Sequence, residues 1–216
     1  MNKLINEHLC EIEQYMLKNA GDAAHDADHI YRVLNQALKI AKNYDVNYDI
    51  LVAACLLHDV GRPAQFADPA VCHAEIGSNM AYRFLKELGW SEESCLAVKH
   101  CIFTHRFRND QQPETIEAKI LFDADKLDVC GALGIARTLQ YEGKMNYSLR
   151  EFTKEYNRKL VKLYDRFYTD AAKQMAQSSK NILKVFHMEL MEQLDQTEAQ
   201  EWLQKAKTIN ESAVKP

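Results

Sequence analysis

Histidine and aspartate residues stand near the ends of three predicted helices, where their side chains could hold a metal ion. They are His29, the adjacent pair His58 and Asp59, and Asp125. Neighbouring helical residues point about 100° apart, so His58 and Asp59 can reach one ion only where a helix ends. Two imidazoles and two carboxylates form a donor set that suits Mn²⁺, Fe²⁺, Mg²⁺ or Zn²⁺. An ion held in this way keeps positions open for water and lowers the pKa of that water.

Each of these residues also has a purely structural explanation. A single histidine on an apolar helix face is more often a hydrogen-bonded core residue than a ligand. An isolated His-Asp pair also arises by chance in many chains. The ordered set of His29, His58 with Asp59, and Asp125, each on a predicted helix, is much more specific, and it predicts a metal site.

The elements that must position these residues are helices, because apolar residues recur at steps of three and four. The segment ILVAACLL is apolar on nearly all sides, which predicts a buried central helix. Gly61 and Pro63 are expected to end it, and Gly131 and Gly134 to loosen the chain before a short helix through Leu139. The expected helices cover about residues 4–16, 27–41, 47–59, 72–88, 91–105 and 114–129.

Composition supports a single all-α domain over residues 1–216. The chain is 47% hydrophobic and 27% charged, a globular profile, and its 7 Gly and 4 Pro are too few for the turns of an all-β fold. The core is expected over about 22–138, followed by a helical extension over about 148–206. In that extension, one apolar stripe from Phe152 to Phe167 and another from Ile182 to Leu194 predict two long antiparallel helices packed on the core.

Charge and cysteine content narrow the possible partners and location. The net charge of −4 disfavours nucleic acid as a partner, and no uncharged run is long enough to span a membrane. Acidic residues interrupt the apolar start MNKLINEHLCEIEQYML, which is unlike a secretory signal. The 6 cysteines form no Cys-x-x-Cys pair, so we expect reduced thiols in a cytoplasmic protein.

Five stretches occur in an order typical of one family. They are HDADHIYRVLNQALKIA, LVAACLLHDVGRP, CHAEIGSNMAYRFL, AVKHCIFTHRFR and KILFDADKLDVCGALGIAR. The chain thereby resembles the HD-domain metal-dependent phosphohydrolase superfamily, and within it the bacterial YpgQ/YedJ-like subgroup. The resemblance implies an all-α HD-domain helical bundle whose metal is held by His29, His58, Asp59 and Asp125. Asp125 is preferred to its neighbours because the family pattern Ala-Asp-(Lys/Arg)-Leu matches residues 124–127.

Further roles follow from the same resemblance. Asp128, one turn beyond Asp125, is expected either to support a ligand or to act as general base, whereas Asp123 is expected to be solvated or salt-bridged. Some family members bind a second metal with the signature Asp59 bridging, and His73 and His105 are the candidates for its other ligands. Alternatively, these two histidines line the pocket. His100 is expected to be a partly exposed helix residue.

A phosphate substrate needs cationic partners, for which arginine forks are well suited. The residues considered are Arg62, Lys126, Arg32, Arg106 and His25, each of which could instead serve a surface ion pair or another local role.

The expected activity is metal-dependent hydrolysis of a small phosphate ester or anhydride by metal-activated water. A nucleotide is the favoured substrate, with nucleoside triphosphate pyrophosphohydrolase activity. One or two divalent ions are expected, with Mn²⁺ favoured for activity over Mg²⁺, Fe²⁺ or Zn²⁺. The alternatives are an HD-type di-iron oxygenase and a non-catalytic nucleotide-binding regulator. The oligomeric state is left open.

Overall fold

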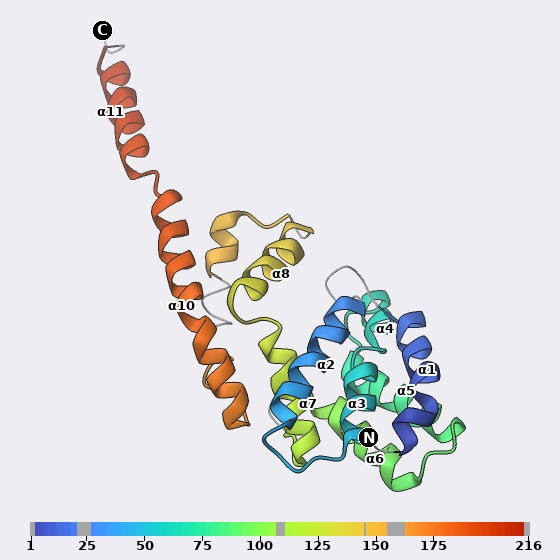
Figure 1. Cartoon of the computed structure of the whole chain (residues 1–216). Helices are drawn as coiled ribbons and strands as arrows, with labels where there is room; N and C mark the ends of the chain where they lie inside the picture. Colours follow the sequence, from blue (N-terminus) through green and yellow to red (C-terminus); the bar gives the residue numbers. More distant parts are fainter. Residues whose placement is uncertain (1–2, 21–26, 107–110, 145, 155–162, 214–216) are drawn as a thin grey trace.

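The architecture is helical throughout the described part of the chain (Figure 1). The computed structural model describes residues 3–20, 27–106, 111–144, 146–154 and 163–213, with side chains described as far as residue 207. Within these ranges there are α-helices and no β-strand, which confirms the predicted all-α fold. None of the described helices is both long enough and apolar enough to cross a membrane.

The core is a bundle built around the helix with the most apolar sequence. That helix, α3 (Tyr48–Leu57), packs against α1, α2, α5, α6 and α7. Leu51, Ala54 and Leu56 are buried on different sides of α3, as expected for a helix without a polar face. The surrounding helices are α1 (Lys3–Lys18), α2 (Ala27–Ala41), α5 (His73–Glu87), α6 (Glu92–Thr104) and α7 (Ile116–Leu127).

Side-chain caps explain where three of these helices begin. Asn47 accepts hydrogen bonds from the backbone N–H groups of Asp49 and Ile50 at the start of α3. Ser91 and Thr115 do the same for α6 and α7. Because a cap satisfies otherwise unpaired N–H groups, such residues define helix starts that can be read from sequence.

The predicted end of the central helix before Gly61 and Pro63 is confirmed, whereas the prediction for Gly131 and Gly134 was wrong. Gly61 and Pro63 do follow α3, but they also start a short helix, α4 (Arg62–Ala67), since proline is tolerated in a first helical turn. Gly131 and Gly134 do not loosen the chain; they belong to α8 (Gly131–Lys144). Gly131 has a φ of 61°, and a Cβ on Gly134 would lie 2.1 Å from the Val129 carbonyl oxygen. These glycines therefore allow the tight turn from α7 into α8.

The C-terminal helices pack on the core only in part. Helix α10 (Asp170–Gln193) packs against α7 and α8, whereas α11 (Thr197–Ala213) extends away from the bundle (Figure 1). Phe152 and Phe167 of the first predicted stripe are buried, while its residues Tyr156 and Leu160 lie outside the described residues. The packing predicted for this region therefore applies to one side of α10 and not to α11.

Asp123 is fully buried and does not lie in solvent, so the expectation for this residue was wrong. Its carboxylate accepts hydrogen bonds from the backbone N–H groups of Tyr168 and Thr169, at 2.9 and 2.7 Å, and from the Thr169 hydroxyl at 2.6 Å. Burial raises the pKa of Asp123. Thr169 caps α10, so Asp123 joins the start of that helix to α7.

A second close contact joins the end of α3 to α5. A Cβ on Gly61 would lie 2.2 Å from the His73 carbonyl oxygen and 2.7 Å from the Gly77 backbone nitrogen. Both distances are far below van der Waals contact, and both partners are backbone atoms that cannot rotate away. Only glycine at position 61 lets the two segments approach so closely.

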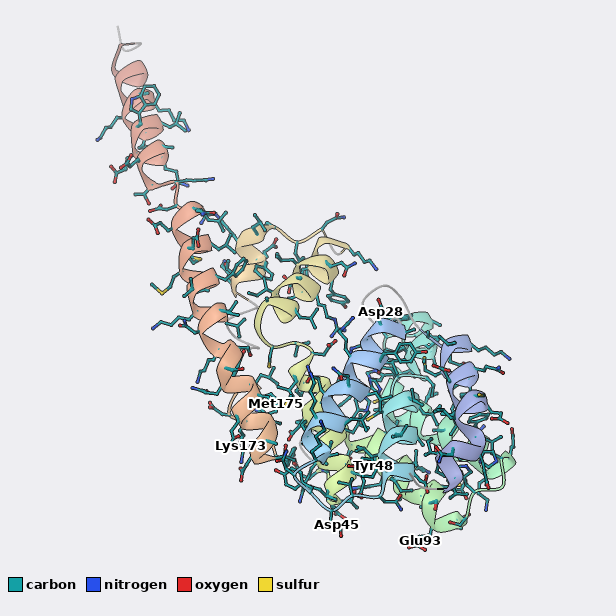
Figure 2. All side chains as sticks on the ribbon, in the orientation of Figure 1. Asp28, Asp45, Tyr48, Glu93, Lys173 and Met175 are labelled. Atoms are coloured by element: carbon teal, nitrogen blue, oxygen red, sulfur yellow. The ribbon has the colours of Figure 1, made fainter. Side chains whose placement is uncertain are left out.

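Replacing Asp123 by alanine is expected to lower the free energy of unfolding by about 1–3 kcal/mol, because buried N–H donors lose their acceptor. Urea unfolding followed by circular dichroism measures this change. The matched control is Asp45→Ala at an exposed position (Figure 2), expected within about 0.5 kcal/mol of wild type. Equal stability of the two variants contradicts the role of Asp123.

Gly61→Ala is expected to destabilise the protein by about 1–3 kcal/mol, since backbone must shift to admit one methyl group. Gly143→Ala is the control, because a Cβ at Gly143 meets nothing within 4 Å and alanine favours helix. Thermal unfolding of both variants tests the difference. A Gly61→Ala protein as stable as wild type argues against the close packing.

Candidate metal centre

Four side chains from separate parts of the sequence converge at one point in the bundle. His29 comes from α2, His58 and Asp59 follow α3, and Asp125 lies on α7. The Nε2 atom of His29 lies 3.4 Å from His58 Nε2, 3.7 Å from Asp59 Oδ2 and 3.5 Å from Asp125 Oδ1. His58 Nε2 is 3.7 Å from the same Asp59 oxygen. This spacing is that of neighbouring ligands around one ion.

The end of α3 explains why two adjacent residues can face the same point. The last residue of the helix is Leu57, and His58 is its C-cap. Asp59 follows in the turn between α3 and α4, beyond the last residue of the helix. His29, His58 and Asp59 are all buried, which places the charged and polar groups inside the apolar bundle.

Hydrogen bonds on the far side of each ring orient the two imidazoles. His29 Nδ1 donates to Asp128 Oδ2 at 2.7 Å, and His58 Nδ1 donates to the Cys55 carbonyl oxygen at 2.8 Å. With a proton on each Nδ1, each Nε2 presents its lone pair to the centre, as metal-binding imidazoles do. Burial lowers the pKa of His58, which favours the neutral ring that binds metals.

Asp59 carries the clearest sign that a cation belongs here. Its Oδ1 accepts a hydrogen bond from Arg62 Nε at 2.9 Å, but its buried Oδ2 has no hydrogen-bond partner in the described structure. Burial opposes ionisation, yet neighbouring His58 and Arg62 hold the pKa of Asp59 well below its usual range. An ionised, buried oxygen without a donor is costly. A divalent ion among the four ligands removes that cost, so the residues fit a metal.

A second group of ligands shares Asp59. His73 Nε2 lies 3.3 Å from Asp59 Oδ1, His105 Nε2 lies 3.8 Å from it, and the two imidazole nitrogens are 3.3 Å apart. His73 Nδ1 pairs with Gln65 Oε1, and His105 Nδ1 pairs with the Ile102 carbonyl oxygen. Burial lowers the pKa of His73 to about 2 and that of His105 to about 3. These three residues form a second set of possible metal ligands.

His100 lies outside both groups. Its Nε2 accepts a hydrogen bond from the Glu114 backbone N–H at 3.2 Å. His105 instead lies next to Asp59. The structure therefore places at the centre the histidine that the family resemblance favoured. The difference follows from helix geometry, because His100 and His105 project from different faces at the end of α6.

Asp128 lies behind His29. One carboxylate oxygen binds His29 Nδ1, on the side of the ring opposite Nε2, and Arg32 donates to both oxygens at 2.9 and 3.1 Å. Burial opposes ionisation of Asp128, but hydrogen bonds from His29 and Arg32 hold its pKa below the usual value. Of the two roles expected for Asp128, this position favours orientation of His29 over proton abstraction.

Arg137 is a component that sequence reasoning missed. It comes from α8 and donates to the Asp128 carboxylate and to the Asp128 carbonyl oxygen. The tight turn at Gly134 brings α8 close enough for this contact. The only signal for Arg137 in the sequence is its position at the end of the stretch KILFDADKLDVCGALGIAR.

Two of the predicted substrate-binding residues, Arg62 and Lys126, contact carboxylates of the centre directly. Lys126 Nζ lies 2.6 Å from Asp125 Oδ2 and 3.1 Å from the His105 carbonyl oxygen, while Arg106 donates to Cys72 Sγ beside His73. His25 lies outside the described residues. The cations at this centre outnumber the carboxylates Asp59, Asp125 and Asp128; they are Arg32, Arg62, Arg106, Lys126 and Arg137. The arrangement therefore attracts anions even before a metal is counted.

Comparison with known proteins identifies the family of this centre. Residues 26–130, which include both ligand groups, match the HD domain. The crystal structure of an HD-superfamily hydrolase from Bacillus thuringiensis superposes with a TM-score of 0.65 at 30% identity, covering 88% of this chain and 95% of that one.

Two further relatives share parts of the sequence. YpgQ of Bacillus subtilis is 28% identical over 176 residues, 78% of this chain and 83% of YpgQ. Its crystal structure in complex with ADP superposes with a TM-score of 0.69 at 24% identity, covering 86% and 97%. The 3'-5' exoribonuclease YhaM of Listeria innocua is 26% identical over 115 residues, 46% of this chain and 37% of that enzyme. With the His-Asp ligand sets and the match to the Bacillus thuringiensis enzyme, these findings establish that the chain belongs to the HD superfamily of hydrolases.

Proposed function

We propose that this protein is a metal-dependent phosphohydrolase that converts a nucleoside triphosphate and water into a nucleoside monophosphate and pyrophosphate. The observation that carries the proposal is the unpartnered, buried Oδ2 of Asp59 among converging imidazoles and carboxylates. This oxygen is suited to bind a divalent cation, and the surrounding arginine and lysine side chains are suited to bind an anion with several charges.

The nucleotide part of the proposal has separate support. YpgQ, a sequence relative of this chain, was crystallised in complex with ADP. ADP carries the base, ribose and first two phosphates of a nucleoside triphosphate. The excess of cations around Asp59 and Asp125 suits such a chain of phosphates better than a single neutral or weakly charged group.

The ligands His29, His58, Asp59 and Asp125 would hold the metal, which supplies a Lewis acid for a phosphoryl oxygen and lowers the pKa of a water molecule. Asp128 keeps Nε2 of His29 aimed at the centre by holding Nδ1. Arg62 and Lys126 lie beside two of the metal-binding carboxylates, where they can bind phosphate oxygens and offset charge on the pyrophosphate leaving group. Burial of the ligands limits the water that can compete at the centre.

We infer one resident metal ion and a weaker second position. The first group offers four ligands, including the Asp59 oxygen that lacks a hydrogen bond. The second group offers His73, His105 and the other Asp59 oxygen, which Arg62 already binds. A cation in the second position must therefore share Asp59 Oδ1 with a guanidinium. Mn²⁺ is the favoured ion, because it accepts a mixed set of imidazole and carboxylate ligands.

One observation keeps a second candidate function in view. Asp59 touches both ligand groups, and a bridging carboxylate of this kind also fits a di-iron oxygenase. Iron content and visible absorption of the purified protein distinguish the two. A regulator that binds nucleotides without turnover would leave the nucleotide intact in an assay of nucleotide hydrolysis.

Metal-stripped protein supplied with Mn²⁺ is expected to release pyrophosphate and a monophosphate from nucleoside triphosphates. Asp59→Ala removes a ligand to both groups and is expected to lower the rate by about 10³-fold or more. Asp45→Ala, on the exposed surface, is the control and should retain full activity. Release of orthophosphate alone contradicts the proposed bond, and cleavage of RNA in place of nucleotides moves the substrate to phosphodiesters.

Metal titration by calorimetry separates the two ligand groups without relying on activity. His29→Ala is expected to weaken binding of the tight Mn²⁺ ion by at least about 10-fold, as loss of one ligand does. His73→Ala is expected to keep the tight ion, and His100→Ala serves as a histidine control outside both groups. Equal loss in the His29→Ala and His73→Ala proteins contradicts a single resident site.

A further inference from the structure

Helix α4 supplies two side chains to the second ligand group, which consists of Asp59, His73 and His105. Arg62 and Gln65 are three residues apart on this short helix, so they lie on neighbouring parts of one face. Gln65 Oε1 pairs with His73 Nδ1, and Arg62 Nε donates to Asp59 Oδ1 at 2.9 Å. The same helix therefore orients one imidazole of the group and brings a positive charge to its carboxylate.

The ligand atoms of this group are acceptors that face one another. His73 and His105 carry their protons on Nδ1, because Gln65 Oε1 and the Ile102 carbonyl oxygen accept hydrogen bonds there. The two Nε2 atoms, 3.3 Å apart, then direct their lone pairs toward the same place. Asp59 Oδ1 lies 3.3 Å from His73 Nε2 and adds a carboxylate charge. Three acceptors at such distances repel one another unless a positive charge lies beside them.

Among the described residues, Arg62 is the cation that donates to a ligand atom of this group. Its side chain is 18% exposed and that of Asp59 is 1% exposed, so water and salt screen the pair only weakly. Lys126 donates to other acceptors, Asp125 Oδ2 and the His105 carbonyl oxygen. Arg62 therefore supplies positive charge at the carboxylate oxygen that a second ion would bind.

We propose that the guanidinium of Arg62 takes the place of a second metal ion at this centre. In hydrolases with two metals, both ions stabilise charge on the reacting phosphate oxygens. A guanidinium can do the same, because its planar fork offers several donors to carboxylate and phosphate oxygens. The Nε atom of Arg62 binds Asp59, and the terminal nitrogens are the donors for a phosphate. This role rests on the proposed hydrolysis of a nucleotide, and it makes Arg62 a catalytic residue.

Removing the guanidinium is expected to create a tight metal site. The Arg62→Ala protein keeps His73 and His105 and frees Oδ1 of Asp59 to become a third ligand. Calorimetric titration with Mn²⁺ should give one tight ion for wild type and two for Arg62→Ala. The second ion should bind at least about 10-fold more tightly than in wild type, as the gain of one ligand implies. Electron paramagnetic resonance should show a coupled pair of ions, a gain that misfolding cannot produce.

Two further variants make this result specific. Adding His73→Ala to Arg62→Ala removes a ligand of the new site, so the double variant should return to one tight ion. Arg32→Ala is the matched control, because its guanidinium binds the carboxylate of Asp128 in place of Asp59, and it should keep one tight ion. A single tight ion in the Arg62→Ala protein, or two tight ions in wild type, overturns the inference.

Rescue of hydrolysis by metal tests the catalytic role. With one equivalent of Mn²⁺, Arg62→Ala is expected to release pyrophosphate from a nucleoside triphosphate at least about 10-fold more slowly than wild type. Excess Mn²⁺ should restore most of this rate, but not when His73→Ala is also present. Two bound ions without recovery contradict the catalytic role of Arg62.

The same measurements separate this inference from the proposed function. If wild type releases pyrophosphate but Arg62→Ala still binds one tight ion, the inference fails and the proposed function stands. If Arg62→Ala gains a tight ion but wild type hydrolyses no nucleotide, the nucleotide substrate is wrong and the place assigned to the guanidinium stands.

Discussion

The carboxylate of Asp59 is an ionised group inside an apolar bundle, and the arrangement of the whole core depends on stabilising this charge. Burying a charge without partners costs more than most single contacts contribute. The core supplies partners from several elements: Arg62 at one oxygen, and the imidazoles of His29, His58, His73 and His105 around both. Helices α2, α5 and α6 must therefore reach the end of α3 at one point, and the close contact between Gly61 and Gly77 lets α5 do so.

Much of this could be predicted from sequence, because several determinants are local. The helices are identified by the apolar segment ILVAACLL and by the spacing of apolar residues at three and four. Their starts are identified by the caps Asn47, Ser91 and Thr115. The ligand set was recognisable because its members stand at helix ends, in an order that resembles a known family. The structure then brings His29, His58, Asp59 and Asp125 within contact of one another.

What could not be predicted depends on contacts between distant segments. Asp123 looks like a surface carboxylate in an acidic stretch, and only the backbone of residues 168 and 169 makes it an internal hydrogen-bond acceptor. Gly134 is a helix breaker by local propensity, but the close Val129 carbonyl makes it a requirement of the turn into α8. Arg137 then reaches Asp128 from that helix. For such residues the tertiary environment outweighs the local preference.

The hydrogen bond between His29 and Asp128 joins residues 99 positions apart in the chain. During synthesis, α2 and α3 emerge and can begin to collapse before α7 has been made. During that time His29 lacks its partner Asp128. The complete ligand set cannot assemble until Asp125 has left the ribosome, and the support of His29 by Asp128 follows three residues later. Acquisition of the metal is thereby tied to the near-completion of the core, and a truncated chain that ends before α7 cannot form the four-ligand site.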